Sequence, residues 1–248
     1  MTEILIPAAD MRDLAQRIFV AVGCSAAEGE RIARHLVVAN LTGHDSHGVI
    51  RIPRYLQWMD KGWLRPNQSV TAIADSPAMA LLEGHHGFGQ TLGEQAVDIG
   101  VAKARTAGVA VVALRHAGHL GRIGDWAEQA AEAGLVSIHL VNVAGSILVA
   151  PFGGVERRMA TNPVAIGVPM PGAPPLILDF ATSAVAEGKA MVAHSGGKPL
   201  PEGVLIAADG RFSSDPAVFY GPKIPGETPD HGKGKGALRA MGEHKGSG

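Results

Sequence analysis

The chain has 248 residues, of which 46% are hydrophobic, and its 22 Lys and Arg residues against 23 Asp and Glu residues give a formal net charge of -1. A chain of this length can bury one large hydrophobic core or two smaller ones. The near-neutral charge, without an extended basic run, excludes the electrostatic footprint of a nucleic-acid-binding protein or of one held on an anionic membrane surface. We therefore expect a globular protein that binds neither nucleic acid nor membrane.

Three features bear on the cellular location. The single cysteine, Cys24, excludes an internal disulfide and favours a reducing compartment. Residues Met1 to Asp10 lack the basic start and the apolar run of a secretory signal. The longest apolar stretch, Leu135 to Phe152, is interrupted by polar residues such as His139, so it predicts buried strand and loop rather than a transmembrane helix. The expected location is the cytoplasm.

The first quarter of the chain is predicted to be helical. Ala8 to Val22 shows the apolar spacing of a helix. Ser25 and Glu28 form a capping-box pattern ahead of a second amphipathic run that continues to Leu41. A third helix is expected from Arg51 to Met59.

From about residue 70, short apolar runs alternate with helical patterns. The valine-, leucine- and isoleucine-rich runs Val109 to Leu114 and Leu135 to Val143 predict strands covered on both faces. Each of them follows a predicted helix, and two further strands are expected at Val164 to Val168 and Leu176 to Phe180. This pattern predicts an α/β fold.

We therefore expect two parts, a helical part over residues 1–72 that binds substrate and an α/β domain over residues 73–248 with a central mixed sheet flanked by helices. Residues 209–248 are rich in glycine and proline and contain few large apolar side chains. Such a segment has little to bury, so it is expected to run as a surface loop without a core of its own.

The strongest chemical signal is Ser46-His47-Gly48, followed by Arg51 and Tyr55. A histidine can transfer a proton, and a guanidinium can hold a carboxylate. At positions i and i+4 of one helix, His47 and Arg51 would share a face. This pattern predicts a redox or proton-transfer site for a 2-oxo or 2-hydroxy acid.

Two glycine-rich segments raise the question of a dinucleotide site. Gly87-Phe88-Gly89 lacks the third glycine of the Rossmann fingerprint, because Leu92 stands in its place. Gly118 to Gly121 follows a predicted strand and precedes a helix predicted from Arg122, so its amide groups could hold a phosphate. A plain strand-to-helix turn explains the same glycines equally well.

Two histidine pairs raise the question of a metal. His44 and His47, like His116 and His119, are spaced at i and i+3 and could share a zinc ion with a carboxylate such as Asp45. The His-Glu-x-x-His pattern and cysteine ligands are both missing. No metal is therefore expected, and a metal-dependent hydrolase remains a third hypothesis.

Two polar clusters lie at the edges of apolar runs. In Thr161-Asn162-Pro163 the proline forces an extended Asn162, which leaves the Thr161 hydroxyl able to bond a ligand or a neighbouring carbonyl. Asp179 to Ser183 lies at the end of a predicted strand, where a site could form, and it equally resembles a helix N-cap.

Taken in order, these motifs resemble the type-2 malate/L-lactate dehydrogenase family, which includes sulfolactate and ureidoglycolate dehydrogenases and cyclic-imine reductases. The resemblance covers nearly the whole chain. Its motifs are Ser46-His47-Gly48, Arg51, Tyr55, Gly118-His119-Leu120-Gly121, Pro151-Phe152-Gly153-Gly154, Thr161-Asn162-Pro163, Leu178 to Ser183, Gly188-Lys189, Leu200 to Gly203, Ser214-Asp215-Pro216 and His244-Lys245-Gly246.

The resemblance implies a homodimeric enzyme that uses NAD or NADP, held in a dinucleotide-binding fold that is not of the Rossmann type, to interconvert a small 2-hydroxy acid and its 2-oxo acid. It makes His47 the acid/base with Ser46 tuning it, Arg51 the carboxylate clamp, His119 a second acid/base and Thr161 a substrate contact. The cofactor contacts that it implies are His119, Leu120, Gly121, Arg122, Ile123, Ser146, Asp179, Phe180, Ala181 and Lys245.

The chain departs from the family pattern at two points. Lys189 stands where the cyclic-imine reductases carry an aspartate, which favours an open-chain 2-hydroxy acid over an imine. The family also continues beyond His244-Lys245-Gly246, so we expect this chain to lack the C-terminal segment. The alternative hypothesis is accordingly a non-catalytic remnant that folds or dimerises without turnover.

Overall fold

The computed structural model describes residues 5–143, 145–197, 199–225, 227 and 229–242. The chain forms two compact units, and each consists of two separate stretches. Unit 1 comprises Met1–Ser137 and Ile166–Ile177, and unit 2 comprises Ile138–Ala165 and Leu178–Gly248. The boundaries of these units differ from the expected boundary at residue 72. The expected roles of residues 1–72 in substrate binding and of residues 73–248 in cofactor binding stay predictions.

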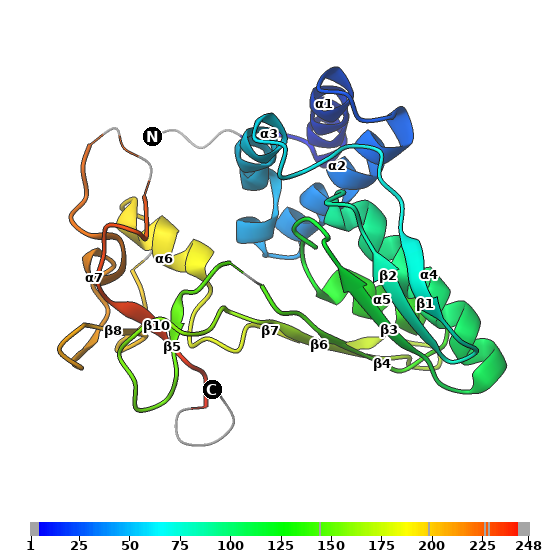
Figure 1. Ribbon diagram of the computed structural model, residues 1–248. Helices are drawn as coiled ribbons and strands as arrows, with labels where there is room; N and C mark the ends of the chain where they lie inside the picture. The colour runs from blue at the N-terminus through cyan, green and yellow to red at the C-terminus, as the bar shows by residue number, and fades with distance from the viewer. Residues whose placement is uncertain (1–4, 144, 198, 226, 228, 243–248) are drawn as a thin grey trace. The chain divides into compact units, whose positions relative to one another are not determined.

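The predicted N-terminal helices are present as α1 (Ala8–Ala21), α2 (Ala26–Leu41) and α3 (Ile52–Asp60) (Figure 1). The Ser25 hydroxyl caps α2 by accepting a hydrogen bond from the Glu28 amide at 3.2 Å. Only half of the predicted capping box forms, because the Ser25 amide donates to Asn67 Oδ1 at 2.7 Å. The Glu28 carboxylate instead accepts from the Asn67 amide at 2.5 Å and from the Thr91 hydroxyl at 3.1 Å. The start of α2 is thereby tied to a distant loop.

The hydrophobic core of the helical region is aromatic. Phe19, Tyr55 and Phe88 are each at most 1% exposed. The rings of Phe19 and Phe88 meet edge to face with centroids 5.7 Å apart, and Tyr55 packs against both. Tyr55 therefore anchors α3 to this core and places its phenolic hydroxyl in the interior of unit 1.

A three-stranded mixed sheet follows, built from β1 (Thr71–Asp75), β2 (Met79–Glu83) and β3 (Val111–Arg115). β2 pairs antiparallel with β1 and parallel with β3. The crossover between β2 and β3 is α4 (Gly89–Ala107), and α5 (Gly124–Glu132) follows β3 (Figure 1).

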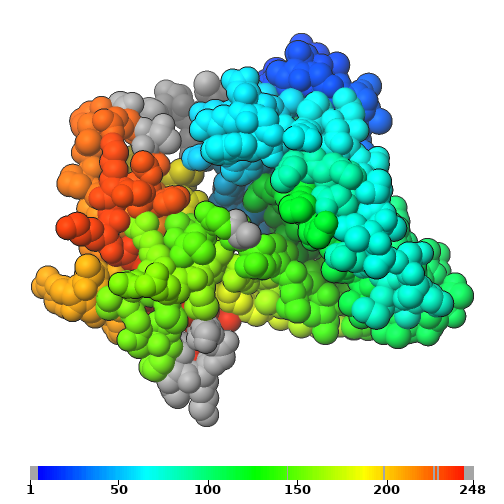
Figure 2. Space-filling view, in the orientation of Figure 1, coloured from blue at the N-terminus to red at the C-terminus, as the bar shows by residue number. Residues whose placement is uncertain are grey.

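The prediction that these strands are covered on both faces is wrong. Val112 of β3 packs against α4 near Gly100, whereas its neighbour Val111 is 56% exposed. Every residue of β1 is exposed, and this strand contributes to the cyan surface in Figure 2. In β4 (Ser137–Leu140), Leu140 is 76% exposed. The sequence runs are rich in apolar residues, but within the described chain α4 packs on only one face of the first sheet.

The α/β class with mixed sheets is confirmed, although the strands are divided among three small sheets rather than one. The second sheet has the order β4-β6-β7, and the third, in unit 2, has the order β5-β10-β8-β9 (Figure 1). The remaining elements are β5 (Val149–Ala150), β6 (Val164–Val168), β7 (Leu176–Phe180), α6 (Glu187–His194), β8 (Leu205–Ile206), β9 (Phe212–Ser213), α7 (Ala217–Tyr220) and β10 (Ala237–Arg239). Among the described residues, no helix has the length and apolar character needed to cross a bilayer.

The prediction that residues 209–248 form a surface loop is wrong for the described part of that stretch. Phe219 and Leu238 are fully buried, and Tyr220 is 1% exposed. The glycines permit this packing, because a Cβ on Gly234 would lie 2.1 Å from the Phe219 carbonyl oxygen. A few apolar residues are therefore enough to build a core where the backbone approaches closely.

The Arg157 side chain holds this core together. Its guanidinium donates to the carbonyl oxygens of His231, Phe219, Gly234 and Gly236 at 2.6 to 3.0 Å. It also lies 4.5 Å from the centroid of the Phe219 ring. Burial lowers the pKa of Arg157. The short segments of unit 2 are thus joined through one cation and four backbone carbonyls.

Candidate functional site

The chain between α2 and α3 forms two short 3-10 helices, η1 (Asp45–His47) and η2 (Val49–Arg51). The prediction that His47 and Arg51 lie on one continuous helix is therefore wrong. Gly48 separates the two turns with φ -86° and ψ -155°. Asn40 Oδ1 occupies the space where a Gly48 Cβ would stand and accepts the Val49 amide at 2.9 Å. Because Gly48 has no Cβ, the Asn40 side chain can lie against it and hold the turn between η1 and η2.

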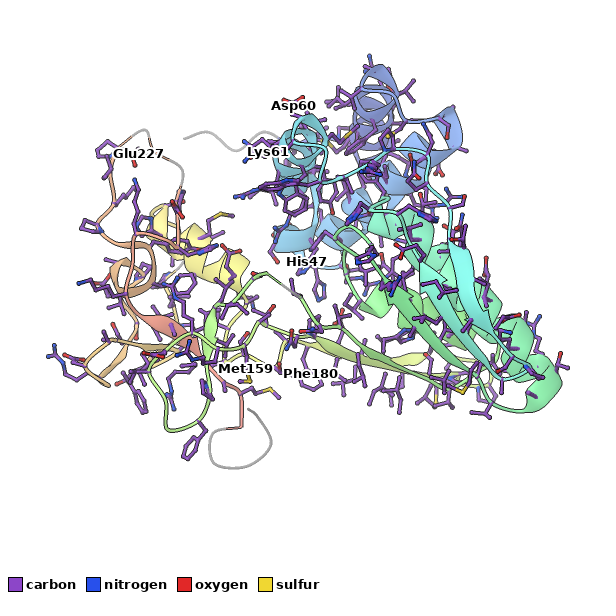
Figure 3. All side chains as sticks on the ribbon, viewed as in Figure 1. His47, Asp60, Lys61, Met159, Phe180 and Glu227 are labelled. Atoms are coloured by element: carbon purple, nitrogen blue, oxygen red, sulfur yellow. The ribbon has the colours of Figure 1, made fainter. Side chains whose placement is uncertain are left out.

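The residues of the motif still gather at one place in unit 1. Arg51 Nε donates to the Ser46 carbonyl oxygen at 2.5 Å, which holds the guanidinium beside the turn. Ser46 Oγ and His47 Nδ1 are 3.0 Å apart and share a hydrogen bond. Figure 3 labels His47 in the segment that leads into α3. The predicted proximity of His47 and Arg51 is thus present without the predicted helix.

The loop after β3 brings a second histidine to the same place. The rings of His119 and His47 are stacked, with centroids 5.3 Å apart and an interplanar angle of 15°. The Tyr55 hydroxyl lies 2.7 Å from His119 Nδ1 and also accepts a hydrogen bond from Gln90 Nε2 at 3.0 Å. Elements far apart in sequence therefore present two imidazoles and one guanidinium together.

Glycines allow the loop that carries His119 to lie directly against the start of α4. The Gly118 amide donates to the Gly87 carbonyl oxygen at 2.8 Å. A Cβ on Gly89 would lie 2.2 Å from the His119 carbonyl oxygen. The close approach of two backbones accounts for these glycines, and it explains why Gly87-Phe88-Gly89 resembles only part of a Rossmann fingerprint.

Burial and charge keep both histidines neutral at physiological pH. Burial, followed by the charges of Arg51 and His44, lowers the pKa of His47 from 6.5 to about 4, against a smaller opposing effect of Asp125. Burial also holds the pKa of His119 well below its usual range, with Arg51 and His47 acting in the same direction. Two neutral imidazoles beside a fixed cation suit a ligand that carries a carboxylate and a hydroxyl or carbonyl oxygen.

A buried ionic network behind the histidines was not found from the sequence. Asp125, in the first turn of α5, accepts from Arg122 Nε at 2.6 Å and pairs with His35 Nδ1 at 2.5 Å. Arg122 also donates to Glu128 at 2.6 Å. The spacing of Asp125 three residues after Arg122 could have indicated their ion pair. No sequence pattern connects Arg122 or Asp125 to His35.

The expected cofactor contacts of unit 1 lie on this loop. Gly121, Arg122 and Ile123 are buried, and the Arg122 guanidinium is bound by two carboxylates. His119 and Leu120 retain partial exposure. The following helix begins at Gly124 rather than at Arg122.

The histidine pairs do not gather as a metal site. His116 is exposed and its Nδ1 contacts the Glu83 carboxylate at 2.9 Å, while His119 faces His47 and Tyr55. No group of three metal-ligating side chains occurs within the described part of the chain. The hydrolase hypothesis therefore gains no support.

The polar clusters of unit 2 meet around a pocket of about 320 Å³. The Thr182 hydroxyl donates to the carbonyl oxygens of Thr161 and Asn162 at 3.1 and 3.0 Å. The prediction of an extended Asn162 before Pro163 is wrong, because Asn162 has φ 27°. Its side chain accepts a hydrogen bond from the Val143 amide at 3.1 Å. The pocket is lined by Leu140, Val141, Asn142, Asn162, Pro163, Val164 and Thr182.

The expected unit 2 contacts lie in or near this region. Asp179 and Phe180 end β7, and Ala181 directly precedes Thr182, which lines the pocket. The alternative of a helix N-cap at Asp179 to Ser183 is wrong, because α6 begins at Glu187. Ser146 follows β4 and donates its amide to the Val143 carbonyl oxygen at 3.3 Å. Lys245 lies outside the described residues.

Comparisons with known proteins identify the family. A family model described as malate/L-lactate dehydrogenase matches residues 6–248. The chain belongs to this family. Hydroxycarboxylate dehydrogenase B of Escherichia coli (strain K12) is 42% identical over 231 residues, which are 93% of this chain and 61% of that protein. L-lactate dehydrogenase of Cupriavidus necator is 38% identical over 237 residues, which are 95% of this chain and 65% of that protein.

A solved structure supports the same family. Sulfolactate dehydrogenase from Methanocaldococcus jannaschii aligns with a TM-score of 0.82 at 30% identity, covering 96% of this chain and 64% of that one. The predicted resemblance to malate/L-lactate dehydrogenases is confirmed. This chain spans less than two thirds of the length of each of these relatives.

Proposed function

We propose that the chain is the part of an NAD- or NADP-dependent oxidoreductase that binds a small 2-hydroxy acid or its 2-oxo acid for hydride transfer. The observation that carries the proposal is the cluster of His47, His119 and Arg51, in which two stacked imidazoles lie beside one cation. The names of the relatives, which are hydroxycarboxylate, lactate and sulfolactate dehydrogenases, support the same substrate class.

Arg51 binds the substrate carboxylate, since a guanidinium offers paired donors to two carboxylate oxygens. Its Nε already donates to the Ser46 carbonyl oxygen, which leaves the terminal nitrogens to the ligand. His47, with His119 as the second acid/base, takes the proton of the substrate hydroxyl during oxidation and returns it to the oxygen during reduction. Ser46 orients this ring through the 3.0 Å contact to Nδ1.

Binding of an anion also tunes the base. The Arg51 charge is one cause of the low pKa of His47. A substrate carboxylate next to Arg51 offsets that charge, so the pKa of His47 rises when the acid binds. A base that is weak in the free protein thereby becomes able to accept a proton only with its substrate in place.

The residues of unit 2 fit a nicotinamide group. Their pocket combines the apolar surface of Leu140, Pro163 and Val164 with the amide side chains of Asn142 and Asn162. Small-molecule sites commonly combine apolar walls with a few polar groups in this way. When bound, the nicotinamide ring accepts or gives a hydride.

We carry over the other expected contacts as part of the proposal. Thr161 contacts the substrate. The cofactor is held by His119, Leu120, Gly121, Arg122, Ile123, Ser146, Asp179, Phe180 and Ala181. Lys245, which lies outside the described residues, is a further proposed cofactor contact. The proposal includes a cytoplasmic homodimer. Lys189 is exposed on α6 and favours an open-chain acid over a cyclic imine.

The test is oxidation of a panel of 2-hydroxy acids by the full chain, followed through the absorbance of reduced nicotinamide. His47→Gln is expected to lower kcat by roughly 10²- to 10⁴-fold, which is the usual contribution of general acid–base catalysis. Arg51→Gln is expected to act mainly on KM for the acid. The matched controls are His86→Gln and Arg54→Gln, both at exposed positions of unit 1.

Equal losses in a variant and its control would contradict the assigned roles. The non-catalytic alternative gains no support from the comparisons, and it predicts that neither NADH nor NADPH raises the melting temperature. A cofactor-dependent rise in melting temperature without turnover would retain the binding assignment and reject the catalytic one.

A further inference from the structure

The first turn of α5 carries a buried carboxylate that contacts two other parts of unit 1. Asp125, His35 and Arg122 are 9%, 8% and 6% exposed. Asp125 Oδ2 lies 2.5 Å from His35 Nδ1 on α2, and Asp125 Oδ1 accepts a hydrogen bond from Arg122 Nε at 2.6 Å. Both carboxylate oxygens therefore have partners, and the group is enclosed in protein rather than exposed to water.

Trp126, the next residue, ties the same turn to the loop that carries His119. The Trp126 indole Nε1 donates to the Leu120 carbonyl oxygen at 3.1 Å. The His35 ring packs against the indole with ring centroids 5.0 Å apart. Because Leu120 directly follows His119 in the chain, the position of His119 depends on where α5 begins.

Helix α2 holds the turn that carries His47. Asn40, in the last turn of this helix, accepts a hydrogen bond from the Val49 amide at 2.9 Å. Asp125 contacts the same helix through its histidine partner. This carboxylate therefore joins the helix that supports His47 to the helix that supports the loop of His119.

The charge of Asp125 also acts on His47. Burial, Arg51 and His44 lower the pKa of His47 to about 4, whereas Asp125 acts in the opposite direction. The stacked His119 is neutral at physiological pH, because burial holds its own pKa well below the usual range. Protonation of His47 therefore places a positive charge next to Arg51, and Asp125 supplies a negative charge that opposes this cost.

We propose that Asp125 is a positioning residue that holds the loop of His119 against α2 and stabilises the positive charge that His47 gains with a proton. This role rests on the proposed function. In oxidation the C–H bond of the 2-hydroxy acid breaks, and its hydride carries two electrons to the nicotinamide ring. The O–H bond also breaks, its proton goes to the pair of histidines, and the carbon–oxygen double bond of the 2-oxo acid forms. Asp125 keeps its charge and exchanges no proton.

The experiment measures the pKa of His47 in the full chain by NMR titration of protein labelled with nitrogen-15 histidine, and the His47→Gln spectrum assigns the signal. The titration is run without ligand and again with oxamate, an unreactive analogue of a 2-oxo acid. Asp125→Asn keeps the size of the side chain and removes its charge. It is expected to lower the pKa of His47 below the parent value in each titration, because a charge that raises this pKa is lost.

Two further variants keep the titration decisive. Glu128→Gln removes the other carboxylate that binds Arg122, at 2.6 Å, and it is expected to leave the pKa of His47 unchanged. The double variant Asp125→Asn with Arg122→Gln leaves no uncompensated buried charge, so it should fold even if Asp125→Asn alone does not. It is also expected to lower the pKa of His47. An unchanged pKa in both Asp125 variants, or an equal fall in Glu128→Gln, would overturn the proposal.

Kinetics separate the charge of Asp125 from its structural contacts. If the chain turns over, Asp125→Asn is expected to lower kcat for oxidation by about tenfold, which is the effect of one pKa unit, and to move the acidic limb of the pH profile to lower pH. His35→Gln keeps a donor for the carboxylate and should lower the melting temperature without moving that limb.

The kinetic outcomes that contradict the proposal are equally specific. A limb that moves as far in His35→Gln as in Asp125→Asn would show that the charge is not the cause. A loss of turnover in Asp125→Asn with an unchanged limb would leave Asp125 a structural role alone. Absence of turnover in the parent protein would reject the proposed function, and the titration without ligand would then decide whether Asp125 acts on His47.

Discussion

Acid should destabilise unit 1 through His47, and the size of the effect follows from its environment. The pKa of His47 is lowered from 6.5 to about 4 by burial, by Arg51 and by His44. Between pH 6.5 and pH 4, His47 is protonated in the unfolded chain but neutral in the folded chain. The free energy of unfolding therefore falls as the pH is lowered from 6.5 to 4. At about 1.4 kcal/mol for each pH unit, and with some screening of the partly exposed ring, the loss is at most roughly 3 kcal/mol.

The assay compares the parent protein with His47→Gln by urea unfolding at about pH 7.5 and about pH 4. All of the tryptophans, Trp58, Trp63 and Trp126, belong to unit 1, so their fluorescence reports the unfolding of that unit. The parent protein is expected to lose more stability between the two pH values than His47→Gln does, by up to roughly 3 kcal/mol. His86→Gln, at an exposed position, controls for the general effect of removing a histidine. Equal losses in the parent protein and in His47→Gln would refute the reasoning.

Three further outcomes are expected elsewhere in the chain. Gly89→Ala places a methyl group against the His119 backbone, so it should lower the melting temperature and the turnover together, with a cost of about 1 to 3 kcal/mol. Arg157→Met leaves four carbonyl oxygens without their donor, so amide hydrogen exchange in unit 2 should accelerate, as expected for a loss of about 2 kcal/mol or more. Because burial raises the pKa of Cys24 to about 12, a thiol-specific disulfide reagent should react with it only after unfolding.

Local patterns predicted the elements well wherever one stretch of chain decides its own conformation. The apolar period of α1 and α2 and the capping Ser25 were sufficient for those helices. The strands of the α/β region followed from dense β-branched runs. Which face of a strand is buried depends on residues elsewhere in the chain. The apolar runs of β3 and β4 do not indicate which of their faces is exposed.

The site was partly predictable for the same reason. His47 and Arg51 lie close together in sequence, so their proximity could be expected even though Gly48 interrupts the helix. The hydrogen bonds between Gln90 and Tyr55 and between Tyr55 and His119 join residues from three separate parts of the chain. No spacing rule connects such positions, and only the folded backbone brings them together.

The failure over residues 209–248 has a different cause. The prediction treated a glycine-rich segment as one that buries little surface. In the structure, Gly234 and Gly236 let the backbone approach Phe219 and Val218 closely. Arg157 then satisfies carbonyls that would otherwise be exposed to an apolar core. Glycine content alone therefore underestimates how much of a short apolar segment can be buried.

The interleaving of the two units sets an order for their formation during synthesis. Unit 1 includes Ile166–Ile177, so its contacts cannot be complete until residue 177 has emerged from the ribosome. By then the stretch Ile138–Ala165 has already been made, but it must wait for partners translated after Leu178. A nascent chain therefore carries the first segment of unit 2 before the rest of that unit is made, and neither unit can be cut out of the gene as a single continuous piece.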